Sequence, residues 1–175
     1  MTTTTTSSGT PPAGDTIADR LTAMGLTLPQ VTRPPAGVTL PFPWVRVIGD
    51  RAYISGHGPL NADGSLAHPL GKVGLDLSLD EAYAAARLTA LAMLGSLQRE
   101  LGSLERVDCW VKALGMVNVA TDFNLTPSVI NGFSDLIFTL WGPERGAHAR
   151  SAVGMAALPF DMPVEIEAEV RLLPA

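Results

Sequence analysis

The chain has 175 residues, enough for one domain with a substantial core. Its net charge is -5 and it has no run rich in Lys or Arg, so we expect it not to bind nucleic acid. No apolar run approaches the roughly 20 residues that cross a bilayer, and the Thr/Ser-rich N-terminus lacks the pattern of a signal peptide. We therefore expect a cytoplasmic protein without a membrane partner.

The apolar content predicts self-association. Hydrophobic residues make up 46% of the chain and charged residues only 17%. The single cysteine, Cys109, lies in an apolar run and is interpreted as a buried core residue. With the three scattered histidines it forms no recognisable metal-ligand spacing, so no metal site is predicted.

The N-terminal part divides into a tail, a helix and a proline-rich lead-in. Residues 1–16 are of low complexity and are predicted to be a disordered tail before a single domain over 17–175. Residues 17–24 have the apolar spacing of a short helix that ends at Gly25. The prolines of residues 26–43 exclude regular helix.

The middle of the chain predicts a hairpin, a long helix and a long strand. Residues 44–48 and 52–55 flank a Gly-Asp turn, and the second strand runs into Gly56-His57-Gly58, where the glycines indicate close approach of another group to the backbone. Ser78 and Glu81 fit a capping box for a helix that ends at Gly102. Residues 107–118 form a strand that is apolar on both faces.

The last third predicts a second main helix and two strands. The helix spans about 127–140 and ends at Trp141-Gly142-Pro143. Strands over 151–158 and 164–172 flank a Pro-rich turn, and the second alternates so that its glutamates share one face. The pattern predicts an α+β fold with two helices on one face of a mixed sheet.

Arg150 is the main candidate binding residue. It precedes a strand with few polar side chains, where an unpaired charge would be costly to bury, so it needs an anion. That anion is either a carboxylate of the chain, from Glu144, Glu165 or Glu167, or the carboxylate of a ligand held by the guanidinium fork. If the last two strands form a hairpin, Glu165 lies near Arg150 and can orient water or move protons; alternatively it is a solvated surface residue.

Two further residues near the glycine pair are candidates. His57 could act as a general acid or base because imidazole titrates near neutrality, or it could be an incidental loop histidine. Ser55 could be a nucleophile, but no catalytic-triad order or nucleophile-elbow motif supports that role.

These motifs together resemble those of the reactive intermediate deaminases, the Rid or YjgF family, in the subgroup named "putative endoribonuclease". The resemblance covers about residues 42–172. It is carried by Tyr53-Ile54-Ser55-Gly56-His57-Gly58-Pro59, Val129-Ile130-Asn131-Gly132-Phe133, Ala149-Arg150-Ser151-Ala152-Val153-Gly154, Leu158-Pro159 and Val164-Glu165-Ile166-Glu167-Ala168. It implies a chorismate-mutase-like fold with a six-stranded mixed sheet. It also implies a homotrimer with clefts between subunits, without metal or organic cofactor.

The resemblance further implies an enamine/imine deaminase, which hydrolyses a reactive amino-acid-derived enamine or imine to a 2-keto acid and ammonia. Arg150 would hold the substrate carboxylate and Glu165 would position the attacking water. Further substrate-binding positions implied by the family pattern are Phe42, Ser55, Gly56, Asn131 and Ala152.

The sequence departs from the family pattern at three positions. Phe42 stands where deaminase members usually have tyrosine, His57 where they have glutamine, and Ala152 where they have cysteine or a similar residue. His57 is the candidate to replace the lost hydroxyl in proton transfer. The alternatives are a non-catalytic trimer that binds a small carboxylate, and a biosynthetic enzyme that uses the same cleft for another imine or carbonyl reaction. Ribonuclease activity is the least favoured, because the chain is acidic.

Overall fold

A computed structural model describes residues 15–34 and 36–174. The predicted tail therefore lies outside the described residues, apart from its last two positions. There the Thr16 hydroxyl accepts from the backbone N–H of Asp19 and caps the first helix, and Asp15 forms an ion pair with Arg20 at 2.9 Å. Each of these two residues thus contacts the helix that follows it.

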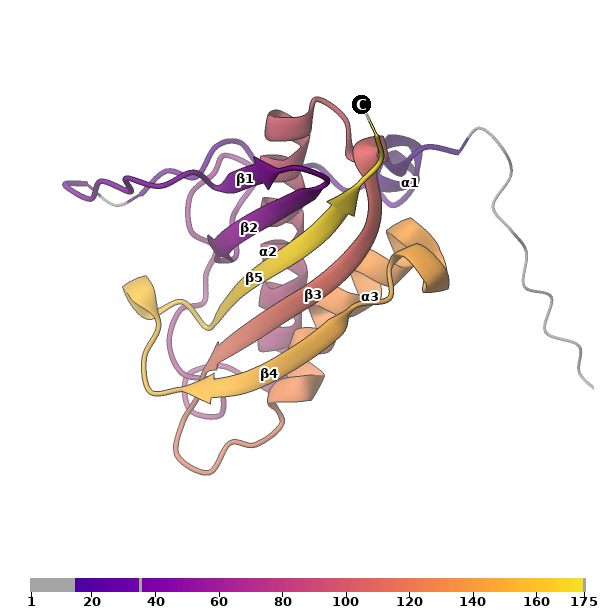
Figure 1. The fold of residues 1–175 in the computed structure, drawn as a ribbon. Coiled ribbons are helices and arrows are strands. Elements are labelled where there is room, and N and C mark those ends of the chain that lie inside the picture. The colour runs from indigo at the N-terminus through magenta and orange to yellow at the C-terminus, as the bar shows by residue number, and fades with distance from the viewer. Residues whose placement is uncertain (1–14, 35, 175) are drawn as a thin grey trace, which may run out of the picture.

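The elements follow the predicted order along the chain (Figure 1). The helices are α1 (Ile17–Ala23), α2 (Leu79–Leu101) and α3 (Thr126–Arg145), and the strands are β1 (Val45–Ile48), β2 (Arg51–His57), β3 (Val107–Asn118), β4 (Ala149–Met155) and β5 (Val164–Leu172). The capping box at Ser78 and the left-handed C-cap at Gly102 confirm the predicted bounds of α2. In α3 the helix breaks at Gly142, with φ of 77°, and one further turn reaches Arg145.

The five strands form one mixed sheet in the order β1-β2-β5-β3-β4. All neighbours are antiparallel except β3 and β4, which are parallel and joined through α3. The last two strands do not form the hairpin on which the expected proximity of Glu165 to Arg150 depended, because β3 lies between β4 and β5. The connection over residues 156–163 is longer than a tight hairpin turn, so it can cross the end of β3.

The sixth strand implied by the resemblance is not found among the described residues. The segment between β2 and α2 makes only isolated bridges, Leu60 with Leu66 and Val73 with Leu77 and Val119. Gly71 and Gly74, with φ of 119° and 90°, turn the chain there and prevent a continuous strand.

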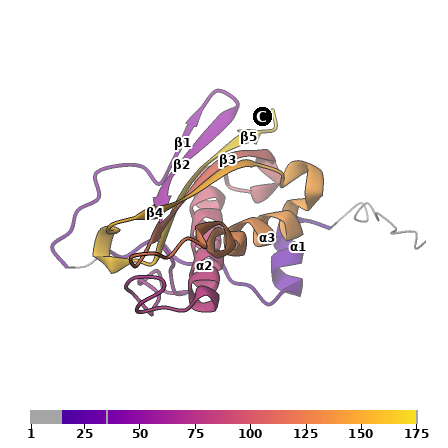
Figure 2. The ribbon, with the colours of Figure 1, turned by 90° about the horizontal axis from the view of Figure 1, so that it is seen from below.

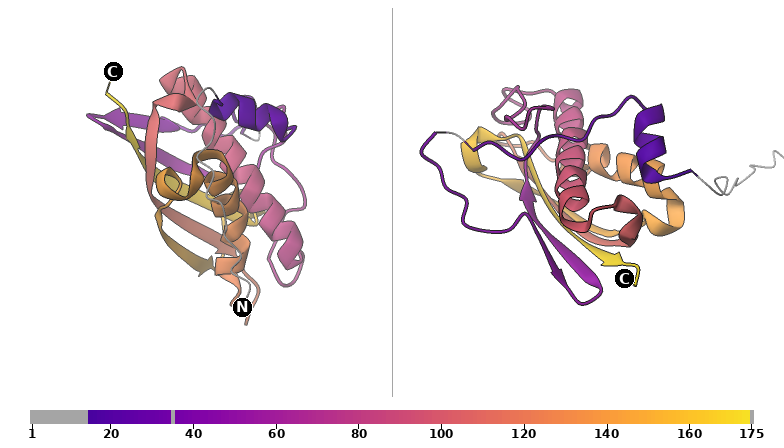
Figure 3. Two further views of the ribbon diagram at one scale, coloured as in Figure 1. Left: turned by 90° about the vertical axis from the view of Figure 1, so that its right-hand side faces the viewer. Right: turned by 90° about the horizontal axis from the view of Figure 1, so that it is seen from above.

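The helices cover one face of the sheet and leave the other open (Figures 2 and 3). The core lies between them, with Trp110, Phe133, Leu94 and Ile166 almost fully buried. The alternation predicted for β5 is confirmed, since Val164 and Ile166 are buried whereas Glu167 is exposed. Within the described residues, none of the helices combines the length and apolar character required to cross a membrane.

Candidate functional site

Arg150 lies on the edge strand β4, and its guanidinium turns toward the first half of α3. Its Nη1 donates to Asn131 Oδ1 at 3.0 Å and to Ser134 Oγ at 2.8 Å, and its Nη2 donates to the Pro127 carbonyl at 3.3 Å. None of the ion pairs among the described residues involves Arg150, so the predicted bridges to Glu144, Glu165 and Glu167 are not formed in this chain. Burial lowers the pKa of the guanidinium, and the charge of Asp135 opposes that shift. The cation is held by neutral acceptors alone.

Ser134 and His148 form a chain of hydrogen bonds that ends at Arg150. His148 Nδ1 lies 2.7 Å from the Gly146 carbonyl and must donate to it, which leaves Nε2 as an acceptor for the Ser134 hydroxyl at 3.0 Å. The oxygen of that hydroxyl is then available to accept from Arg150. Burial lowers the pKa of His148, and the Arg150 charge lowers it further, which favours this neutral form. These contacts orient the guanidinium without an ion pair to a carboxylate of the described chain.

Glu165 lies against the bulge in β2. The pairing of β2 with β5 shifts register between Ile54 and His57, and at Gly56 an added Cβ would lie 2.0 Å from Glu165 Oε1. The absence of a side chain at Gly56 therefore makes room for the carboxylate. Burial, with the nearby charge of Glu167, raises the pKa of Glu165. No hydrogen bond or ion pair to its carboxylate is found within the described chain, so the group is a half-buried base.

The second glycine of the pair accommodates a methionine. A Cβ at Gly58 would lie 2.0 Å from Met162 Sδ, so the predicted close approach to both glycines is confirmed. Glu165, Gly56, Gly58 and Met162 line one cavity of about 240 Å³ together with Phe42 from the proline-rich lead-in. Phe42 packs edge-on against Trp44, with the ring centroids 5.3 Å apart.

His57 lies in the core and not in this cavity. It is 1% exposed, its Nδ1 lies 2.6 Å from the Ser55 carbonyl, and its Nε2 lies 2.9 Å from Ser96 Oγ. Burial lowers its pKa to about 4. Because both ring nitrogens are occupied and the ring is neutral near pH 7, the geometry gives no support to the predicted proton transfer by His57.

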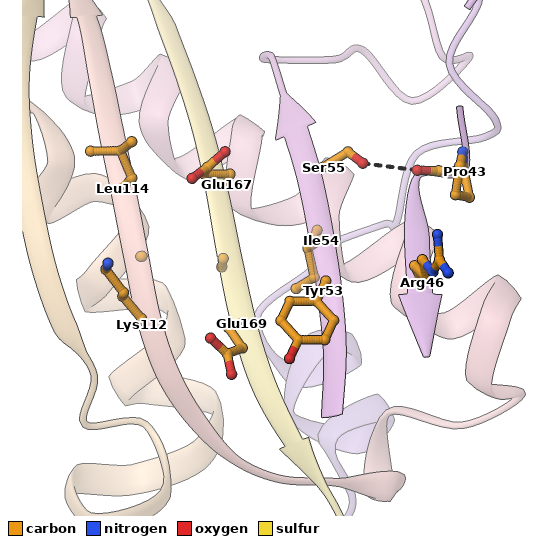
Figure 4. A pocket seen from close by; sticks show the side chains of 11 residues that line it. Pro43, Arg46, Tyr53, Ile54, Ser55, Lys112, Leu114, Glu167 and Glu169 are labelled. Carbon is orange, nitrogen blue, oxygen red and sulfur yellow. Dashed lines mark hydrogen bonds between the residues drawn. The ribbon is translucent and has the colours of Figure 1, made fainter. Parts of the chain in front are cut away.

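Ser55 and Ala152 lie outside the cavity at Glu165 and apart from each other. Ser55 Oγ donates to the Pro43 carbonyl at 2.8 Å, and the residue lines a shallow cavity of about 480 Å³ on the open sheet face with Lys112, Glu167 and Glu169 (Figure 4). Ala152 is half-buried on β4, where its carbonyl accepts from Thr126 Oγ1 at 3.0 Å. Among the described residues, no three potential metal-ligating side chains converge.

The predicted site residues thus fall into two groups. Arg150 and Asn131 lie together at α3, whereas Glu165, Gly56 and Phe42 share the cavity beside β2. Arg150 is aligned through Ala113 of β3 with Ala168 of β5, three residues from Glu165, so the side chains of Arg150 and Glu165 point to opposite faces of the sheet. One chain does not bring them together.

The supporting residues were not assigned from the sequence. Ser134 and His148 position Arg150, and Trp44 and Met162 line the cavity. Only Ser134 had a usable signal, since it follows Asn131 by three residues and therefore shares its face of α3.

The fold and these two groups define a small α+β protein with an arginine held by neutral acceptors at a sheet edge and a half-buried carboxylate beside a bulged strand. A family model described as "YjgF/chorismate mutase-like, putative endoribonuclease" matches residues 18–166. The chain therefore belongs to this family, as the sequence resemblance predicted.

Individual relatives match almost the whole chain. Protein TCP17 of Trypanosoma cruzi is 37% identical over 162 residues, which cover 91% of this chain and 96% of that protein. The crystal structure of Atu1372 from Agrobacterium tumefaciens, a protein of unknown function, has a TM-score of 0.78 and 36% identity, covering 90% of this chain and 92% of that one. A Shewanella oneidensis structure described as a "putative endoribonuclease" has a TM-score of 0.79 and 28% identity, covering 90% and 99%.

Proposed function

We propose that the protein hydrolyses a reactive enamine or imine carboxylate to a 2-keto acid and ammonia, in clefts between the subunits of a homotrimer. The proposal is supported by the properties of two side chains, one able to bind an anion and one able to accept a proton. Arg150 is a cation held by neutral acceptors, and Glu165 is a half-buried base with a raised pKa. A substrate whose carboxylate lies next to an electrophilic imine carbon needs a cation to hold the carboxylate and a base to activate water.

Two copies of the chain are required because Arg150 and Glu165 point to opposite faces of one sheet. A heterologous contact, in which different surfaces meet, would place Arg150 of one copy beside Glu165 of the next, and such contacts form a ring when the rotation between copies closes. The open sheet face supports association, since Tyr53 and Val153 are 42% and 40% exposed there. A trimeric ring would provide three equivalent clefts.

The Arg150 guanidinium has an edge suited to a carboxylate. Nη1 is occupied by two acceptors and Nη2 by one at 3.3 Å, whereas Nε has no acceptor among the described residues. The Nε and Nη2 side can therefore donate two parallel hydrogen bonds to a substrate carboxylate. The attached C=N bond would then be fixed relative to the neighbouring subunit's cavity.

Hydrolysis then needs water and a base. An enamine first becomes its imine when its carbon takes up a proton and its nitrogen gives one up. Glu165 accepts a proton from water as the water oxygen bonds to the imine carbon and the C=N electron pair moves to nitrogen. The proton on Glu165 passes to that nitrogen, which gives a carbinolamine. Glu165 then takes the hydroxyl proton of the carbinolamine and passes it to the nitrogen, the C=O bond forms as the C–N bond breaks, and ammonia leaves a 2-keto acid. The raised pKa of Glu165 strengthens it as a base in the first step and suits it to return the proton in the second.

The test is complementation between two inactive variants. Arg150→Ala and Glu165→Gln, each alone, should lose hydrolysis of 2-aminoacrylate generated by a serine or cysteine lyase, measured as pyruvate and ammonia release. When both variants are co-expressed and mixed oligomers are purified by two tags, about one cleft in three of a mixed trimeric ring carries both native residues, and a corresponding activity should return. Mixed oligomers of wild type and the double variant are the assembly control.

Two results would remove the proposal. A wild type that accelerates no imine hydrolysis excludes the activity. Full activity in a monomer, or no recovery in mixed oligomers that contain both variants, excludes the shared cleft.

A non-catalytic carboxylate-binding role is a second candidate. Two observations favour this role: His57 is buried away from the cavity, and Phe42 has no hydroxyl. In the described part of the cavity lining, Glu165 is therefore the only candidate for proton transfer, since the other charged residue there is Arg33. Calorimetric binding of 2-keto acids that is lost in Arg150→Ala, in a protein without turnover, would favour this role over hydrolysis.

A further inference from the structure

We propose that the cavity at Glu165 selects substrates with a large apolar side chain, aromatic or branched aliphatic, over the small imine derived from serine. This inference rests on the proposed function, since it assigns the side-chain subsite of the same cleft. It is carried by the walls of the cavity. Besides Phe160 at the rim, six of the lining residues are bulky and apolar: Leu40, Phe42, Trp44, Leu60, Leu66 and Met162.

The size of the cavity favours a large group. Its volume of about 240 Å³ is several times the roughly 30 Å³ that one water occupies in the liquid. The methyl group of the imine from 2-aminoacrylate would leave most of this space unfilled. A benzyl or isobutyl group would instead contact the aromatic and aliphatic walls and remove their apolar surface from water.

The charges that line the cavity disfavour substrates with acidic side chains. In the described part of the lining, Glu165 and Arg33 are the charged residues, and Arg33 is exposed, so it can remain in water. A second carboxylate carried into the cavity would lie among apolar walls with Glu165 nearby, at a cost in desolvation and repulsion. Apolar side chains meet no such penalty.

The rim adds a phenylalanine held in an unusual conformation. Phe160 has φ of 56° and Asp161 also has φ of 56°, a region that bulky residues rarely occupy. The turn is tied down at Asp161, whose carbonyl accepts from the Gly71 N–H at 2.7 Å. Phe160 is 41% exposed although it lines the cavity, so its ring can cover a bound apolar side chain.

The methionine gives the cavity tolerance within this class. Met162 is unbranched and polarizable, and Gly58 leaves space for its thioether. Such a side chain adapts to aromatic and aliphatic ligands alike. We therefore assign a class of substrates and not one side chain.

The experiment has a binding arm and a turnover arm, both on the full chain. Calorimetry compares phenylpyruvate and 4-methyl-2-oxopentanoate with pyruvate and 2-oxoglutarate. We expect the two apolar ligands to bind at least about 10-fold more tightly than the other two, the range that apolar pockets achieve. Turnover is measured on imines formed by an L-amino-acid oxidase from phenylalanine, leucine and alanine, with semicarbazide trapping of the remaining imine.

A rim variant and a matched control sharpen the binding arm. Phe160→Asn removes the ring with a residue that tolerates the left-handed conformation, and it should reduce the preference for phenylpyruvate over pyruvate about 5-fold. Leu75→Asn removes an apolar side chain that is 73% exposed and does not line the cavity, and it should leave the preference unchanged.

The outcomes separate this inference from the proposed function. Preferential binding of apolar ligands without turnover supports the subsite and removes the deaminase. Turnover that is equal across side chains, or greatest for the alanine-derived imine, overturns the subsite and leaves the deaminase. Pyruvate or 2-oxoglutarate binding as tightly as phenylpyruvate overturns the subsite, and absence of both binding and turnover overturns both.

Discussion

At the scale of single residues, Gly56 fixes the position of Glu165. An alanine there would place Cβ 2.0 Å from Glu165 Oε1, and the backbone at Gly56 is not in the left-handed region, so the main effect is displacement of the carboxylate. We expect Gly56→Ala to lower kcat/KM for imine hydrolysis by about 10 to 100-fold, because misplaced catalytic groups cost that much. Gly58→Ala is the control. A methyl group added at Gly58 would contact Met162 and not Glu165, so Gly58→Ala should lower kcat/KM less than Gly56→Ala.

Ser134 provides the corresponding test for Arg150. Ser134→Ala removes an acceptor of the guanidinium and leaves His148 Nε2 without its donor. The Kd for 2-keto acids should rise about 10-fold by calorimetry, as for loss of one hydrogen bond to a charged group. Thr139→Ala removes an α3 hydroxyl that bonds only Asp135 of its own helix, and an equal effect there would contradict the role of Ser134.

The burial of His57 predicts how the free energy of unfolding depends on pH. Its pKa is about 4 in the folded chain against 6.5 for an unperturbed histidine, so below about pH 6.5 the unfolded state binds more protons. The stability it contributes is complete above pH 6.5 and is lost as pH falls through 4, up to about 3 kcal/mol. Urea unfolding at several pH values should have a weaker pH dependence in His57→Gln than in wild type. Equal slopes would show that His57 is not held neutral.

At the scale of elements, the two main helices pack closely through a glycine. A Cβ at Gly132 on α3 would lie 2.0 Å from the Tyr83 carbonyl of α2, a backbone atom that cannot move aside easily. Gly132→Ala should lower the free energy of unfolding by about 1–3 kcal/mol through overpacking, although alanine favours helix. Urea denaturation measures this, and Thr139→Ala on the exposed side of α3 should change it by less. A stabilised Gly132→Ala would mean that the helices can separate freely.

Element bounds follow local patterns more closely than strand pairing does. The strands over 107–118 and 164–172 and the capped helix α2 are found as predicted, because alternation, capping residues and terminal glycines are encoded within a few neighbouring positions. The hairpin of β4 and β5 that the sequence left open is not formed, because β3 pairs with β5 instead, through nine partner pairs from Val107 to Val117. Local sequence does not encode that competition.

At the scale of the whole molecule, charge makes a prediction about RNA. The chain has 17 acidic and 12 basic residues, so it gains little from the release of counterions when it contacts a polyanion. We expect no measurable hydrolysis of single-stranded RNA at physiological salt after repeated purification, by gel assay. RNA cleavage that persists through purification and disappears in Arg150→Ala would contradict this.

The sequence by itself determined the family, the order of elements and the residue types of the site. Arg150, Glu165 and the two glycines stand in motifs that can be recognised without coordinates. The tertiary structure decided where they lie. It placed Arg150 and Glu165 on opposite faces, left His57 only 1% exposed and gathered distant apolar residues into one cavity. These outcomes depend on which strand pairs with which and on what packs over each side chain, and such contacts join residues far apart in the chain.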